Sequence, residues 1–287
     1  MFTFRFNPLF KQWVMVGGAV VAPQRVGPAH LLDVGAADGF QAATYPRQPF
    51  ILEPKGETAQ PGSLMHREEP AVGEYELLLY QGPQAFFDWD AAHWERWLTL
   101  LHHRLRQLHQ NAHLHYVTVS LSTAALTTIE NYQRVGDLIA ASHPLHGFLP
   151  LLSTDLADRL RRKEPDFCLF DDSRGRLYVP PAPLHDQEIW YVPSAFRPGI
   201  DGLDSSERSQ VAAVLSRLVH ALHDEFPHRS YRLQIATELG GKDSDGTWWV
   251  QIYAEGPEHS LAVRTLPEAF LAKLVLILGH SFLQAHE

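Results

Sequence analysis

Tyr75-Glu76-Leu77-Leu78-Leu79-Tyr80 opens the pattern that decides the fold, because its apolar run predicts a buried strand. Residues 90–110 follow and predict a helix. Its apolar side chains recur at helical spacing and would share one face: Trp94, Trp97, Leu98, Leu101, Leu105 and Leu108. Residues 115–121 are rich in β-branched side chains and predict another strand. The segment is therefore a strand–helix–strand unit.

A second segment has the same layout. Residues 188–192 predict a strand, and Tyr231-Arg232-Leu233-Gln234-Ile235 alternates as a half-buried strand does. Between them, Asp204 and Glu207 have the spacing of a capping box at the start of a helix. The two segments also have similar lengths, which suggests a duplicated unit. Two ordinary and unrelated α+β segments would give the same layout, so the pattern leaves both interpretations open.

The remaining segments are less regular. Residues 248–253 predict a strand, and Pro267 is placed to open a final helix. Residues 29–70 carry little periodic signal and are expected to form an ordered but irregular arm. The cationic cluster in residues 159–163 is expected to be a solvated helix end rather than a phosphate site.

Composition excludes several classes of protein. The chain has 287 residues and a net charge of -9, which argues against broad nucleic-acid binding. No apolar run approaches the roughly 20 residues of a membrane helix. No secretory leader is recognisable, so a cytoplasmic location is expected. The single cysteine, Cys168, excludes an intramolecular disulfide.

The motif that bears on chemistry is Ser142-His143-Pro144-Leu145-His146-Gly147. A neutral imidazole in such a loop could attack phosphorus and later leave, as a two-step nucleotidyl transfer requires. The chain has 17 histidines, so a loop histidine is by itself weak evidence for a site.

The N-terminus gives the motif a context. It resembles the opening of the galactose-1-phosphate uridylyltransferases, a family of the histidine-triad superfamily with a duplicated α+β half. Further landmarks of that family have counterparts in the same order. The matching segments are residues 5–16, 22–25, 73–77, 129–131, 142–148 and 247–253. The resemblance implies an α+β fold with duplicated histidine-triad-like halves, in which a mostly antiparallel sheet is flanked by helices. The expected halves are residues 1–165, which include the irregular arm, and residues 166–287.

The resemblance also implies roles. Anchoring the motif on His-Gly makes His146 the nucleophile, whereas anchoring it on His-Pro makes His143 the first histidine. A backbone carbonyl or His143 would orient the His146 ring. Asn131 and Ser142 would contact phosphate oxygens, Arg25 would meet the charge of the substrate, and Asn7 of the N-terminal motif is assigned to substrate binding.

The departures from the family pattern concern its metals and one phosphate ligand. The cysteine pair of the family's zinc site falls on residues 48–51, which contain no thiol, and a later zinc histidine falls near Gln84. The histidines of the second metal fall on Gln251 and Tyr253. Phe148 stands where the family has a glutamine that binds phosphoryl oxygens. We therefore expect neither a metal nor another cofactor.

Two functions remain open. One is a nucleotidyltransferase, or a related phosphorylase or hydrolase, that acts on a nucleotide sugar or dinucleoside polyphosphate through a nucleotidyl-histidine. The other is a catalytically degenerate module that binds nucleotides or sugar phosphates, or another protein. A weaker alternative is a metal site at His113 and His115, two apart on an expected strand. The expected partner is a nucleotide or sugar phosphate, not nucleic acid or a membrane. The family commonly forms dimers, which would allow a homodimer.

Overall fold

The computed structural model describes most of the chain and omits several segments. The described residues are 2–7, 12–17, 32–37, 40–44, 68–70, 73–80, 86–122, 128–129, 132–143, 149–163, 167–171, 175–194, 197, 199–239, 246–256 and 267–283. None of the helices described in these ranges is long and apolar enough to cross a membrane.

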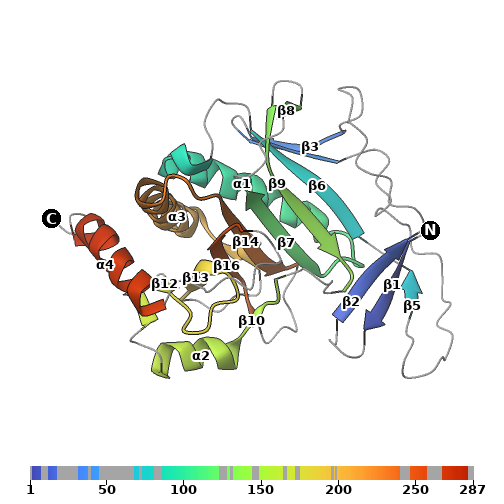
Figure 1. Cartoon of the computed structure of the whole chain (residues 1–287). Coiled ribbons are helices and arrows are strands. Elements are labelled where there is room, and N and C mark those ends of the chain that lie inside the picture. The colour runs from blue at the N-terminus through green and yellow to red at the C-terminus, as the bar shows by residue number, and fades with distance from the viewer. Residues whose placement is uncertain are drawn as a thin grey trace.

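An 11-stranded antiparallel sheet forms the centre of the molecule (Figure 1). In spatial order its strands are β11 (Cys168–Asp171), β12 (Gly175–Tyr178), β13 (Asp186–Pro193), β16 (Trp249–Ala254), β14 (Tyr231–Glu238), β7 (Tyr116–Ser122), β9 (Tyr132–Ala141), β6 (Gly73–Tyr80), β4 (Phe40–Thr44) and β3 (Leu32–Ala37), with β8 (Thr128–Ile129) paired to β9. The sheet crosses from one half of the sequence to the other without a break.

The strand order confirms the duplication. From the centre outward, the first half runs β7, β9, β6, β4, β3, and the second half runs β14, β16, β13, β12, β11. In each half a helix joins the third of these strands to the first. The halves meet where β7 pairs with β14, from Tyr116 opposite Glu238 to Ser122 opposite Arg232. The α+β class and the duplicated halves are thus as predicted, whereas the boundary between residues 165 and 166 stays a prediction.

Helices cover the sheet unequally. Helices α1 (Ala91–Leu108) and α3 (Ser205–Glu225) pack against one face, which we call the inner face, and against each other. Helix α2 (Thr154–Lys163) packs on the opposite, outer face, over the second half only, where Ala157 and Leu160 contact a smaller apolar cluster. Helix α4 (Pro267–Leu283) begins at the predicted proline and packs beside α3.

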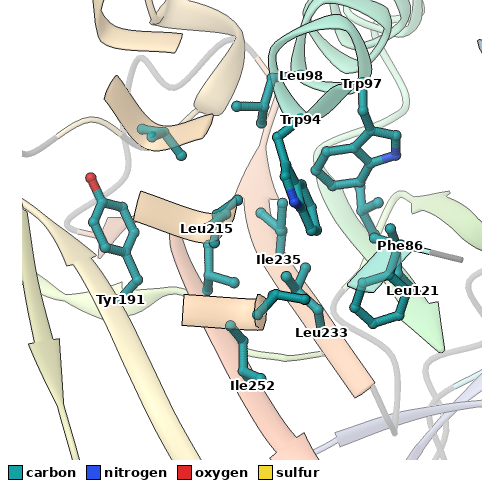
Figure 2. Packing of buried hydrophobic residues seen from close by; sticks show 14 of the residues in the cluster. Phe86, Trp94, Trp97, Leu98, Leu121, Tyr191, Leu215, Leu233, Ile235 and Ile252 are labelled. Atoms are coloured by element: carbon teal, nitrogen blue, oxygen red, sulfur yellow. The ribbon is translucent and has the colours of Figure 1, made fainter. Parts of the chain in front are cut away.

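The main core lies between the sheet and the α1–α3 layer. Trp94 of α1 points toward Ile235 of β14, Trp97 lies beside Trp94, and Leu98 and Leu215 of α3 belong to the same cluster (Figure 2). All five side chains are at most 2% exposed. Burying apolar area on this scale supplies most of the driving force for folding. The apolar helix face predicted from the sequence is the face that is buried.

Two small sheets lie outside the main one. Strand β1 (Phe2–Asn7) pairs with β2 (Gln12–Gly17) and with β5 (Glu68–Pro70). Strand β10 (Leu152–Ser153) pairs with β15 (Gly246–Thr247). Two short 3-10 helices, η2 (Phe86–Asp88) and η4 (Ile200–Gly202), precede α1 and α3.

The prediction of an irregular arm over residues 29–70 was wrong where the structure describes that segment. Residues 32–37 and 40–44 form a hairpin, β3–β4, at one edge of the main sheet, and β5 lies in the small N-terminal sheet. The sequences Leu-Asp-Val-Gly-Ala-Ala and Phe-Gln-Ala-Ala-Thr are poor in β-branched residues, so their strand propensity is low. Pairing of β4 with β6, and of β3 with β4, compensates for that low propensity.

The predicted capping box is present at the start of α3. The Asp204 carboxylate accepts from the Glu207 amide at 2.8 Å, and the Glu207 carboxylate accepts from the Asp204 amide at 2.9 Å. Asp204→Ala is expected to lower the free energy of unfolding by about 1 kcal/mol, because the helix loses its N-cap. Chemical denaturation measures the change, with Gln210→Ala on the same helix as the control. Equal stability of Asp204→Ala and wild type would contradict the assignment.

Candidate functional site

The histidine loop begins where β9 leaves the sheet. Ser142 and His143 follow the last residue of β9, and both are partly exposed. Backbone bonds hold this end of β9 in place, because the His115 amide donates to the Ala141 carbonyl at 3.1 Å. His146 lies outside the described residues, as does Arg25.

His143 is held against the N-terminal motif. Its ring stacks on Trp13 of β2, with the ring centroids 4.4 Å apart and the planes 14° from parallel. Trp13 is 7% exposed, and it lies opposite Phe6 in the pairing of β1 with β2, next to the pair of Asn7 and Gln12. The structure therefore brings together the segment that carries Asn7 and the first predicted histidine. The side chain of Asn7 is not among those that the structure describes.

The residues next to Asn131 lie far from Ser142, the other residue predicted to contact phosphate. Ile129 and Tyr132, on either side of Asn131 in sequence, pair with each other at the start of β9, whereas Ser142 follows its end. At about 3.3 Å per residue, the ten steps from Tyr132 to Ser142 span about 33 Å. One phosphate group is far too small to bridge that separation. Asn131 itself is outside the described residues, so its role, like those of His146, His143, Ser142, Arg25 and Asn7, stays a prediction.

The outer face of β9 carries a polar network that the sequence patterns did not reveal. Asp137 accepts from the Tyr75 hydroxyl at 2.8 Å and from Arg134 Nη2 at 2.6 Å. Arg134 Nη2 also donates to the Tyr75 hydroxyl oxygen at 2.9 Å. The Asp137 side chain is 26% exposed and that of Arg134 is 34% exposed, so the network is open to solvent. No signal in the sequence pointed to this pair, because residues three apart point to opposite faces of a regular strand. The register shift between Gly136 and Arg134 in the pairing with β6 brings the two side chains to one face.

In the second half of the chain, the outer face carries a buried carboxylate, that of Glu188. Its side chain is 1% exposed and lies on the outer face after a bulge at Gln187, whose φ is 50°. One carboxylate oxygen accepts from Trp190 Nε1 and Gln251 Nε2, each at 2.6 Å. The other oxygen accepts from the backbone amides of Leu184 at 2.7 Å and His185 at 2.9 Å. Four donors therefore satisfy this buried carboxylate without a cation.

The residues at the expected second-metal position do not suit a metal. The amide nitrogen of Gln251 points at Glu188, and the Tyr253 ring stacks on His185 with centroids 3.9 Å apart. Burial raises the pKa of the Tyr253 hydroxyl above its usual value, and nearby Arg232 only partly offsets this effect, so Tyr253 stays protonated at neutral pH. A protonated phenol and an amide nitrogen are poor ligands for zinc or iron.

The alternative metal site is not supported either. His113 lies in the turn after α1 and His115 lies before β7 begins, so the alternation of a strand does not apply to them, and both are exposed. Across the described ranges, no group of three or more histidine, cysteine or acidic side chains is arranged to hold a metal ion. The expected zinc positions at residues 48–51 and 84 lie outside the description.

A cavity lies along the C-terminal half of α1, and none of the predicted site residues lines it. Its lining includes His103, Arg106 and His109. It is therefore separate from the histidine loop.

Comparison with known proteins identifies the fold. No protein-family model matches the chain, and no curated protein matches it by sequence. Among solved structures, a uridylyltransferase is similar over 97% of this chain and 99% of its own, with 15% identity and a TM-score of 0.70. Two structures from Arabidopsis thaliana each match 94% of this chain and 97% of their own, with a TM-score of 0.60. They are a galactose-1-phosphate-uridylyltransferase-like protein, at 15% identity, and an ADP-glucose phosphorylase with bound ADP-glucose, at 16%.

These similarities confirm the resemblance in fold that the sequence suggested, and they extend over both halves of the chain. At such low identity they show the architecture alone.

Proposed function

We propose that this protein binds a nucleotide sugar, or a related nucleotide such as a dinucleoside polyphosphate, without transferring its nucleotidyl group. The ligand class is supported by the fold, which the chain shares with a uridylyltransferase and with a phosphorylase solved with ADP-glucose bound. The proposal that no transfer takes place rests on the position of β9. The ten residues of this strand separate Ser142 from the paired residues Ile129 and Tyr132 that lie around Asn131, and none of the ten is a histidine or a cysteine.

The stack of His143 on Trp13 supports the same proposal. A ring in face-to-face contact with a tryptophan that is 7% exposed contributes to packing and is poorly placed to move toward a phosphate. His143 then fixes the start of the loop to β2.

Nucleotidyl transfer through His146 is the second candidate, favoured by the contact between the histidine loop and the N-terminal motif. The lone pair of the neutral His146 imidazole would attack the α-phosphorus. The bond from that phosphorus to the bridging oxygen would break, and its electron pair would leave with the sugar phosphate. An acceptor phosphate would then take the nucleotidyl group and release the imidazole.

Calorimetric titration with UDP-glucose and ADP-glucose tests binding, and we expect saturable binding of at least one of them. A protein that binds neither, nor a dinucleoside polyphosphate, would exclude both candidates. His143→Ala is expected to bind as the wild type does, because the imidazole contacts tryptophan rather than ligand.

Mass spectrometry of protein incubated with each nucleotide sugar and then denatured separates the two candidates. We expect no added nucleotidyl mass and no release of sugar phosphate. A mass gain in wild type and in His143→Ala that is absent in His146→Ala would establish the transferase and overturn the non-catalytic proposal.

A further inference from the structure

A row of polar side chains crosses the outer face where the two halves of the sheet meet. Asp137 of β9 lies opposite Ser120 of β7, and Ser120 lies opposite Gln234 of β14. Directly opposed residues in an antiparallel sheet have Cβ atoms about 5 Å apart, so the three side chains are neighbours. All three are partly exposed. We call Asp137, Ser120 and Gln234 the central row.

The neighbouring position along the strands contains an unsatisfied hydroxyl. Thr118 lies two residues before Ser120 and therefore on the same face of β7. It is 5% exposed, and its Oγ1 has no hydrogen-bond partner among the described residues. Buried hydroxyls are nearly always bonded to protein, water or ligand. The hydroxyl of Thr118 is therefore a polar group beneath the surface beside the central row, without accessible surface of its own for a ligand.

A cation borders the row on its other side. Arg232 lies two residues before Gln234 on β14, opposite Ser122. It donates from Nε to Glu255 at 2.8 Å, and its side chain is 40% exposed. Its side chain also bonds to Tyr253, the residue opposite it on β16. A guanidinium has five N–H donors in a fixed plane, so these two partners leave donors for a phosphate. A phosphate group above Arg232 would be about two residues, roughly 7 Å, from the central row.

The inner face of the same strands is apolar. Val117, Val119 and Leu121 alternate with Thr118 and Ser120 and are buried beneath α1 and α3. In Figure 1 the strands β9, β7 and β14 lie side by side, while α2 lies toward the β16 side of the sheet. No helix in the described part of the chain packs on the central row. The row is therefore a polar surface at the middle of the sheet, accessible to a ligand.

We propose that the central row, with Arg232, binds the sugar-phosphate part of the ligand. The carboxylate of Asp137, the amide of Gln234 and the hydroxyl of Ser120 accept from and donate to sugar hydroxyls, and Arg232 binds the phosphate that carries the sugar. This assignment rests on the proposed function and names the surface on which the ligand lies. It requires no chemistry at the histidine loop, since the row lies on three strands of the sheet.

Gln234→Ala tests the assignment, since Gln234 is partly exposed and its loss leaves the core intact. We expect affinity for UDP-glucose, or for ADP-glucose if that is the ligand bound, to fall about tenfold, while affinity for the matching nucleoside monophosphate stays unchanged. Ser120→Ala is expected to act in the same direction. Gln210→Ala, on the helix face far from the row, is the matched control and should bind as wild type does.

Three outcomes would overturn the assignment. Unchanged binding of the nucleotide sugar by both Gln234→Ala and Ser120→Ala would place the sugar elsewhere and leave the proposed function standing. Equal weakening of the nucleotide sugar and the monophosphate would assign the row to the nucleotide instead. A wild-type protein that binds no nucleotide sugar would remove the proposed function and this assignment together.

Discussion

Arg104→Met is expected to lower the free energy of unfolding by about 3–5 kcal/mol, because it leaves a buried carboxylate without its cation. Glu76 lies in the middle of β6 with its side chain 0% exposed. Arg104 of α1 donates from Nε to both of its oxygens, at 2.7 and 2.8 Å, and a further contact joins Arg104 Nη2 to the same carboxylate. Chemical denaturation at pH 7.5 measures the loss.

The pH dependence of this variant follows from the same burial. Desolvation raises the pKa of Glu76, and Arg104 opposes the rise, so removing Arg104 raises the pKa further. A carboxyl whose folded-state pKa exceeds its unfolded-state value stabilises the fold less as pH rises between the two values. The deficit of Arg104→Met relative to wild type should therefore be smaller at pH 5 than at pH 8. A deficit that grows toward low pH would contradict this account.

The double variant Glu76→Leu/Arg104→Met serves as the control. It removes both charges and leaves apolar side chains at the α1–β6 contact, so its stability should return to within about 1–2 kcal/mol of wild type. A double variant as unstable as Arg104→Met would mean that packing, rather than the unpaired charge, is responsible.

Glu188→Leu is expected to be at least as costly. Four donors, from Leu184, His185, Trp190 and Gln251, would lose their acceptor in a site that is 1% exposed. Each unsatisfied buried donor costs about 1–3 kcal/mol, and the costs are not fully additive, so a total of about 4 kcal/mol or more is expected. The thermal midpoint and the denaturant midpoint should both fall.

Gln251→Leu is the matched comparison. It removes one of the four donors and leaves the carboxylate with three, so a loss of about 1–2 kcal/mol is expected. A chelator should leave the thermal midpoint of the wild type unchanged, because hydrogen bonds rather than a metal hold Glu188. A large drop on chelation, restored by zinc or iron, would contradict the hydrogen-bonded arrangement.

Sequence patterns predicted five of the eleven strands of the main sheet, which are β6, β7, β13, β14 and β16, together with the helices α1, α3 and α4. Strands β3, β4, β8, β9, β11 and β12 were not predicted. The leucine run of β6, the tryptophan and leucine stripe of α1 and the capping box of α3 each encode their element locally, and the structure confirms them. Strands β3 and β4 were missed because their alanine and glycine residues favour no strand on their own. Strand β4 is held by pairing with β6, and β3 by pairing with β4, contacts that a local pattern does not contain.

The site was harder to predict for a different reason. Residues 131 and 142 match two successive landmarks of one family, yet the extended strand β9 lies between them in the sequence. By contrast, Asp137, Ser120 and Gln234 come from three strands and meet only through register. A single sequence shows which residues alternate, but it does not show which strands become neighbours.

The pairing of β7 with β14 has a consequence for how the protein can be divided. In the sheet, strand β7 is the last strand of the first half and β14 is the last strand of the second half, and seven residue pairs join them. If either half were produced alone, the backbone donors and acceptors along one edge strand would be left exposed. Such an edge recruits any available strand, so a lone half would be prone to self-association and aggregation. In the intact protein each half covers the edge strand of the other, so neither edge is free to pair with another chain.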